Sequence, residues 1–165
     1  MQYSKNNKLV IIGASGHGKV IADIATKMNL WDELFFLDDN EGIQNSFGIE
    51  VIGKVTDAGK YINDHDFFIA LGSNASREKL QNQMIEAGAF ITTLIHPHAI
   101  IGEYVEIGKG TAVMAGTVIN CCTQIGQGCI INTGSTIDHD NVIGDYVHIS
   151  PGVNTAGTVS IGKRS

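Results

Sequence analysis

The chain has 165 residues, of which 43% are hydrophobic and 17% are charged, and its formal net charge is -6 at pH 7. This length suits one ordinary domain or two small ones, and the negative charge argues against nucleic acid or an anionic membrane as the main partner. The longest apolar run, KLVIIGA, is too short to insert into and span a bilayer or to act as a signal peptide.

Cysteine usage points to a reducing compartment. The chain has three cysteines, two of them adjacent, and an odd number favours free thiols and a cytoplasmic location. No spacing of cysteine and histidine matches a zinc site, so we expect no metal.

Strand and helix patterns alternate along the first 94 residues. Strands are expected in KLVII (8–12), DELFFLDD (32–39), HDFFIALGSN (65–74) and FITTLI (90–95). Helices are expected after the first and third of these, in GHGKVIADIATKM and in ASREKLQNQMIEAG. This alternation predicts a small parallel sheet covered by helices, that is, an α/β Rossmann-like domain.

A glycine loop, GASGHG (13–18), joins the first strand to the first helix. Such a loop turns backbone N–H groups and a helix N-terminus towards a phosphate. Asp38 and Asp39 end the next strand, where a ribose-binding acid is expected. The glycine spacing is not that of the dinucleotide fingerprint, and the segment is too short for both halves of a dinucleotide fold. We therefore favour a nucleotide or nucleotide-sugar over NAD, with a tight turn that binds nothing as the alternative.

His17 lies inside this loop. Its ring is either a solvent-facing group or one that reaches towards a ligand or the second domain.

The rest of the chain has a period of six. Eleven of the twelve residues at this spacing are Ile or Val, namely Ile95, Ile101, Ile107, Val113, Ile119, Ile125, Ile131, Ile137, Ile143, Ile149 and Ile161, with Thr155 as the exception. A period of six fits neither a helix nor an extended strand, but it fits a triangular coil of 18 residues per turn. The pattern predicts a parallel β-helix of the hexapeptide type, with inward aliphatic residues, small residues at the fifth position, and glycines that give the turns backbone freedom.

Two domains are therefore expected, residues 1–94 and 95–165, joined near His96 and Pro97 without a flexible linker. His139 and His148 fall at the third and sixth positions of their hexads, between the inward residues. Both rings can thus face outward while the aliphatic ladder stays intact.

The motifs GASGHGKV, LDD, FFIALGSN and LIHPHAIIG, followed by a coil that contains DHDNVIGDYVHISPGVNTAG, resemble the bacterial sugar acetyltransferases of the NeuD/PglD type. That family includes sialic acid O-acetyltransferases and UDP-4-amino-sugar N-acetyltransferases. The resemblance covers nearly the whole chain. It implies a Rossmann-like domain that holds a nucleotide-sugar and a left-handed β-helix that forms a homotrimer.

The resemblance also assigns roles to individual residues. His139 matches the catalytic histidine, Asp140 the acidic residue that raises its basicity, His148 the histidine near the acetyl-CoA thioester, and Gly157 the backbone amide that receives the thioester oxygen. The implied nucleotide-sugar contacts are Ser15, Gly16, His17, Asp38, Asp39 and Gly72.

The expected function is acetyl-CoA-dependent transfer to the amino or hydroxyl group of a nucleotide-activated sugar, such as a UDP-4-amino-sugar, in bacterial surface glycan synthesis. His139 would act as general base and Asp140 would stabilise its imidazolium, while the Gly157 amide would stabilise the oxyanion. The alternatives are a sialic acid O-acetyltransferase and a non-catalytic protein that binds nucleotide-sugar or assembles. A further alternative, a dinucleotide-dependent oxidoreductase, is disfavoured because this chain lacks the second half of that fold and any evident hydride-transfer site.

The chain ends in SIGKRS, partway through the twelfth hexad and after about four coils. The resemblance implies further hexads that help to grip coenzyme A, so the β-helix is expected to be C-terminally short. A truncation, a disordered tail and a natural short form all remain open, as do the acceptor sugar and the acyl group.

Overall fold

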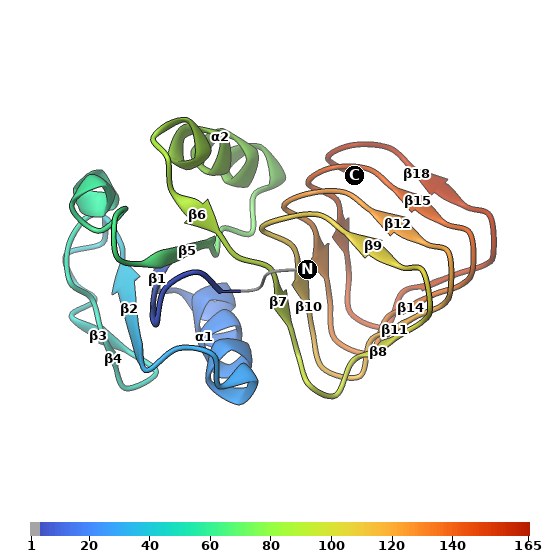
Figure 1. Cartoon of the computed structure of the whole chain (residues 1–165), viewed down its shortest axis with the longest axis horizontal. Coiled ribbons are helices and arrows are strands. Elements are labelled where there is room, and N and C mark those ends of the chain that lie inside the picture. The colour runs from blue at the N-terminus through green and yellow to red at the C-terminus, as the bar shows by residue number, and fades with distance from the viewer. Residues whose placement is uncertain (1–3) are drawn as a thin grey trace. The chain divides into compact units, whose positions relative to one another are not determined.

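The computed structural model describes residues 4–165, and the chain divides into two compact units, the first ending at Thr92 and the second beginning at Thr93. This division lies two residues before the boundary that the sequence pattern predicts. Figure 1 shows a helix-covered sheet in the first unit and a stack of flat coils in the second.

A four-stranded parallel sheet in the order β2-β1-β5-β6 forms the centre of the first unit. Its strands are β1 (Lys8–Ile12), β2 (Glu33–Leu37), β5 (Asp66–Ile69) and β6 (Phe90–Ile91). The helices α1 (Gly16–Met28) and α2 (Asn74–Glu86) lie on opposite faces of the sheet (Figure 1). The connection between β2 and β5 holds the short hairpin β3 (Asn45–Ser46) and β4 (Ile49–Glu50) and the 3-10 helix η1 (Val55–Lys60).

Residue type explains why these segments form the sheet. After Lys8 and Asp66 at their first positions, β1 and β5 are apolar or aromatic runs whose residues are buried, as parallel strands covered on both faces require. The helices end at sequence signals: Asn29 caps α1 in the left-handed conformation at φ 52°, and the Ser73 hydroxyl accepts a hydrogen bond from Ser76 N at the start of α2.

Three parallel sheets form the walls of a β-helix in the second unit, and each contains four two-residue strands. The first sheet comprises β7 (Leu94–Ile95), β10 (Ala112–Val113), β13 (Ile130–Ile131) and β16 (His148–Ile149). The second comprises β8 (Ile100–Ile101), β11 (Val118–Ile119), β14 (Thr136–Ile137) and β17 (Asn154–Thr155). The third comprises β9 (Glu106–Ile107), β12 (Gln124–Ile125), β15 (Val142–Ile143) and β18 (Ser160–Ile161).

The pairing register between successive coils is 18 residues, so that Ile119 lies opposite Ile137 and Ile131 opposite Ile149. The aliphatic ladder fills the interior of the coil, where Ile119, Ile131 and Ile137 have no exposed surface. The triangular coil that the period of six predicts is therefore present.

The glycines that follow the inward aliphatic residues have a different purpose from the one that the sequence suggested. A Cβ atom at Gly108 would lie 2.5 Å from Gln127 N of the next coil, and one at Gly102 would lie 2.7 Å from Cys121 N. Neither residue has a positive φ. These glycines are required because adjacent coils approach closely, and the expectation that they supply turn flexibility is wrong for them.

The left-handed turn conformation occurs at other positions and is adopted by larger residues as well. Tyr104, Cys122, Asp140 and Thr158, which are spaced 18 residues apart, have φ between 57° and 62°. Asp tolerates this conformation better than most residues because its side chain bonds locally. The turn that carries Asp140 is thus one corner of a regular column.

Candidate active site

His139 and Asp140 form a hydrogen-bonded pair on the turn between β14 and β15. The His139 Nδ1 atom lies 2.7 Å from Asp140 Oδ2, and the two side chains are 52% and 55% exposed in this chain. Since Nδ1 faces the carboxylate, Nε2 is the nitrogen left to exchange a proton with a substrate. The pair has the arrangement of a general base and its orienting acid.

Two carboxylates raise the pKa of His139 above its ordinary value. The hydrogen bond that His139 donates to Asp140 is the largest cause, followed by the negative charge of Asp138. Asp138 is itself fixed, because its Oδ1 accepts hydrogen bonds of 2.8 Å from His139 N and from Asn120 Nδ2, and these bonds lower its pKa. The site therefore contains a strengthened base next to a carboxylate that stays ionised.

Gly157 lies one coil further along, directly against the His139 ring. A Cβ atom at Gly157 would lie 2.6 Å from His139 Nε2 and 2.7 Å from its Cε1. The backbone of this turn is also bonded to His139, whose carbonyl oxygen accepts a 3.0 Å hydrogen bond from Thr158 N. The structure therefore brings three of the predicted residues together, namely His139, Asp140 and Gly157.

His148 lies on a different side of the coil, at the start of β16. Its Nε2 is 3.0 Å from Asn132 Nδ2, and the Asn132 Oδ1 accepts a 2.8 Å hydrogen bond from Thr133 N. This second bond orients the amide, so that Nδ2 donates to His148 Nε2. Sequence reasoning missed Asn132, and the available signal was its separation of 16 residues from His148, close to one coil.

The glycine loop of the first unit contains glycines of two kinds. Gly13 and Gly18 are required by packing, since a Cβ atom at Gly13 would lie 2.8 Å from Ala70 O and one at Gly18 would overlap Gly13 O. In contrast, a Cβ atom at Gly16 or at Gly72 would meet nothing within 4 Å. Gly16 and Gly72 thus leave open space at the ends of β1 and β5, where open α/β sheets bind their ligands.

The other predicted residues of the loop lie at the start of α1. Ser15 is the N-cap residue of α1 and makes no capping bond with its side chain. His17 is the second residue of the helix and is half-buried, whereas Ser15 is exposed. An N-cap hydroxyl that does not close the helix end leaves the first N–H groups accessible to an anion.

Asp38 and Asp39 hold the backbone of neighbouring loops. Asp38 Oδ2 accepts a 2.7 Å hydrogen bond from Ala14 N, and its Oδ1 accepts one of 2.8 Å from Asn40 N. Asp39 Oδ1 accepts a 3.0 Å bond from Val55 N. Asp38 therefore ties the end of β2 to the glycine loop, which sequence spacing alone did not indicate.

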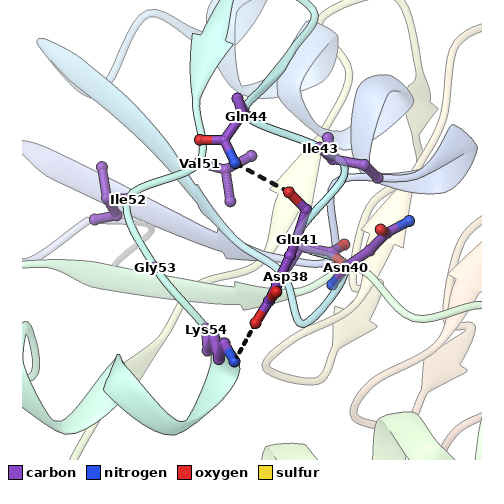
Figure 2. A pocket seen from close by; sticks show the side chains of 9 residues that line it. All are labelled: Asp38, Asn40, Glu41, Ile43, Gln44, Val51, Ile52, Gly53 and Lys54. Atoms are coloured by element: carbon purple, nitrogen blue, oxygen red, sulfur yellow. Dashed lines mark hydrogen bonds and ion pairs between the residues drawn. The ribbon is translucent and has the colours of Figure 1, made fainter.

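Asp38 also lines a cavity of about 460 Å³ in the first unit, shown in Figure 2. Glu41 and Lys54, which both line it, form an ion pair with 2.6 Å between Oε1 and Nζ. Ile43 and Ile52 add apolar walls. The cavity has the size and mixed lining of a site for a small ligand.

Cys121 and Cys122 are exposed and stand one coil before His139 and Asp140, and Asp140 N donates a 3.2 Å hydrogen bond to Cys121 O. Partial desolvation of the thiol, followed by the nearby Cys121 and Asp140, raises the pKa of Cys122, so its thiol is a weak nucleophile. Cys129 is buried at a corner of the coil. Within residues 4–165, no three His, Cys, Asp or Glu side chains are grouped to hold a metal ion, and neither helix has the length and apolar character of a bilayer span.

A Rossmann-like sheet with an open glycine loop, joined to a hexapeptide β-helix with a histidine–carboxylate pair, defines the class of hexapeptide-repeat transferases. The family of the PglD N-terminal domain matches residues 8–84. Among curated relatives, a GDP-perosamine N-acetyltransferase from Escherichia coli O157:H7 is 27% identical over 92% of this chain and 71% of its own length. A UDP-N-acetylbacillosamine N-acetyltransferase from Bacillus subtilis is 38% identical over 65% of this chain and 51% of its own.

Solved structures agree with these relatives. The acetyltransferase domain of PglB from Neisseria gonorrhoeae superposes with a TM-score of 0.91 at 35% identity, covering 94% of this chain and 77% of that one. A perosamine N-acetyltransferase from Caulobacter crescentus in complex with CoA and GDP-perosamine gives 0.90 at 32% identity, covering 95% and 75%. The chain belongs to the NeuD/PglD-type sugar acetyltransferases. The predicted Rossmann-like domain and left-handed β-helix are confirmed.

Proposed function

We propose that the protein transfers the acetyl group of acetyl-CoA to the amino group of a nucleotide-activated sugar. The observation that carries this proposal is the His139–Asp140 pair packed against Gly157 (2.7 Å between Nδ1 and Oδ2). The relatives support the substrate class, because those named above act on GDP- and UDP-linked amino-sugars, and the PglB domain has been solved with acetyl-CoA. N-acetylation is favoured over O-acetylation of sialic acid for the same reason.

In the proposed reaction, His139 Nε2 accepts a proton from the sugar amine while the amine nitrogen attacks the thioester carbonyl carbon. The Gly157 N–H stabilises the oxyanion, a contact worth about 3 kcal/mol in favourable cases. The C–S bond then breaks, and the proton held by His139 passes to the thiolate of coenzyme A. Asp140 stabilises the imidazolium between these two steps, and His148 lies near the thioester.

The nucleotide part of the substrate is proposed to bind the first unit. Its phosphates would bind the open backbone at Gly16 and Gly72 and the N-terminus of α1, with Ser15 and His17 beside them. The cavity that Asp38 lines would take the nucleoside, and Asp38 and Asp39 would contact the nucleotide-sugar. A non-catalytic binding role would use this site alone and leave the His139–Asp140 pair without a purpose.

We also propose that the protein is a homotrimer. Large apolar side chains are exposed on the second and third faces of the β-helix, with Ile100 at 65%, Tyr104 at 83% and Val142 at 49%. We propose that a neighbouring copy covers these side chains in the trimer. Three free thiols are consistent with a cytoplasmic location, where acetyl-CoA is available.

The proposal is tested by coenzyme A release, followed as free thiol, with GDP- and UDP-linked 4-amino-sugars, CMP-sialic acid and free sialic acid. We expect turnover with an amino-sugar nucleotide and a loss of at least about 100-fold for His139→Ala. His98→Ala is the matched control, because His98 is an exposed histidine whose ring contacts His96 and not His139. Near-normal turnover by His139→Ala contradicts the proposal, as does turnover with sialic acid but with none of the amino-sugar nucleotides.

A further inference from the structure

Asn141 is an unusual residue for its place in the β-helix. It occupies the fifth position of a hexad, and the other members of this set are aliphatic, hydroxyl-bearing or cysteine: Ala99, Val105, Thr111, Thr117, Thr123, Cys129, Ser135, Val147, Val153, Val159 and Ser165. Asn141 is fully buried. It is thus the only carboxamide among the fifth positions of the hexads, where the other residues share only a small size.

Hydroxyl residues at this position already connect one coil to the next. Thr111 Oγ1 donates to Gly126 O at 2.9 Å, and Thr123 Oγ1 donates to Asp138 O at 2.9 Å, each across 15 residues. Asn141 Nδ2 makes the equivalent bond to Ala156 O at 2.9 Å. A threonine would suffice for this connection, so the carboxamide must be explained by something else.

The explanation lies in two further bonds. Asn141 Nδ2 is also 2.6 Å from Asp138 O and 3.4 Å from His139 O. These carbonyls belong to the peptide units on either side of His139, so Asn141 fixes both planes that direct the His139 side chain. The third acceptor, Ala156 O, shares a peptide unit with Gly157 N, and in a trans peptide the carbonyl and the N–H point in opposite directions. Drawing Ala156 O inward therefore directs the Gly157 N–H outward.

One atom of this arrangement lowers the stability of the folded chain. Asn141 Oδ1 is buried and has no hydrogen-bond partner, which is unfavourable for a polar group away from water. Reversing the amide would bring Oδ1 against three carbonyl oxygens, so the orientation is fixed by its surroundings. Stability alone would favour threonine or valine here.

We propose that Asn141 is a positioning residue that aligns the His139 imidazole and the Gly157 N–H through one side-chain amide. The proposal rests on the proposed function, in which these two groups are the base and the oxyanion donor. Asn141 itself is buried and touches no substrate.

Two substitutions that other corners of the coil already accept test this role. Asn141→Thr retains a bond to Ala156 O and loses those to Asp138 O and His139 O, whereas Asn141→Val loses all three. We expect both variants to fold with a thermal midpoint no lower than that of the unsubstituted chain, because Thr123 and Val147 occupy equivalent corners. With the KM for both substrates unchanged, kcat is expected to fall about tenfold for Asn141→Thr and about 100-fold for Asn141→Val.

Thr111→Val is the matched control, since it removes the equivalent bridge to Gly126 O in another coil, and we expect its kcat to be unchanged. The imidazole of His139 is followed by NMR titration in each variant. In Asn141→Val its pKa is expected to fall towards the ordinary value, because the bond to Asp140 is no longer held. This readout is independent of turnover.

Unchanged kcat and an unchanged His139 titration in Asn141→Val overturn the proposal, as does a loss of kcat that follows only the loss of folded protein or that Thr111→Val shares. If instead His139→Ala is fully active, the proposed function fails. In that case a shifted His139 titration in Asn141→Val still supports the positioning role, and an unshifted one overturns it.

Discussion

The His139–Asp140 pair sets the pH range in which the proposed base is active. A base must be neutral to accept a proton, and the hydrogen bond that His139 donates to Asp140 keeps His139 protonated up to a higher pH than an ordinary histidine. We therefore expect kcat/KM to rise with pH through an apparent pKa above the ordinary histidine value of 6.5. Below that pKa the imidazolium predominates and activity falls.

Asp140→Asn tests this reasoning, since it removes the carboxylate and keeps the size of the side chain. The pKa of His139 should fall, so the acidic limb of the kcat/KM profile should move to lower pH, while the plateau drops at least about tenfold because the base is weaker. Glu106→Gln is the control, because it removes an exposed carboxylate from another strand. An acidic limb that stays in place would exclude Asp140 as the cause of the raised pKa.

Gly157 has a requirement that is independent of its N–H group. A methyl group at this position would lie 2.6 Å from His139 Nε2, so the ring must move away from its place beside Asp140. We expect Gly157→Ala to fold normally and to lose about 100-fold in kcat, the usual effect of displacing a catalytic group by about 1 Å. Gly162→Ala is the matched control, because a Cβ atom there meets nothing within 4 Å. Equal kcat values for the two variants would contradict the close packing of ring and glycine.

At the level of the elements, the loop between β1 and α1 contains one glycine that packing requires and another that faces the proposed ligand. Gly18 packs against Gly13 O, so Gly18→Ala should destabilise the chain by about 1–3 kcal/mol. Gly16 faces open space, so Gly16→Ala should leave the free energy of unfolding within about 0.5 kcal/mol of the original. It should nevertheless raise the KM for the nucleotide-sugar about tenfold, because a methyl group obstructs the phosphate. Denaturant unfolding and steady-state kinetics on both variants distinguish the two roles, and the reverse pattern would refute them.

The elements also show what a pattern predicts and what it leaves out. The ladder of Ile119, Ile131 and Ile137 is predictable, because a period of six has one geometric solution when each residue is buried. The reason for a glycine at position 108 is not predictable from the sequence, because its close neighbour is 19 residues away and belongs to the next coil. The hairpin β3–β4 and the helix η1 lie in a segment whose sequence has no clear period.

The same limit applies to the candidate site. His139 and Asp140 were identifiable because they are adjacent and match a family motif. The hydrogen bonds from Ala14 N to Asp38, across 24 residues, and from Asn132 to His148, across 16, depend on tertiary folding. Local sequence carries no signal for the backbone amide from which a carboxylate will accept a hydrogen bond. The sequence thus did not predict that the Asp38 carboxylate accepts hydrogen bonds from Ala14 N and Asn40 N. Its contact with the nucleotide-sugar stays a prediction.

For the whole molecule, the central question is how the two histidines cooperate. Within one chain His139 lies on the turn after β14 and His148 begins β16, which belongs to another sheet of the coil. The proposed homotrimer resolves this separation, because a cleft between adjacent chains can take His139 from one chain and His148 from its neighbour. The assembly thus makes a prediction that no monomer can satisfy.

Mixing two inactive variants tests the shared site. His139→Ala and His148→Ala chains are co-expressed, or are unfolded, mixed and refolded together, so that trimers form at random. A site regains both histidines when a His148→Ala chain supplies His139 and a His139→Ala chain supplies His148, which happens in about a quarter of sites by random pairing. Activity should therefore recover to about 25% of the unsubstituted level, whereas each variant alone stays inactive. If each chain used its own two histidines, mixing would recover nothing, because every chain would still lack one of them.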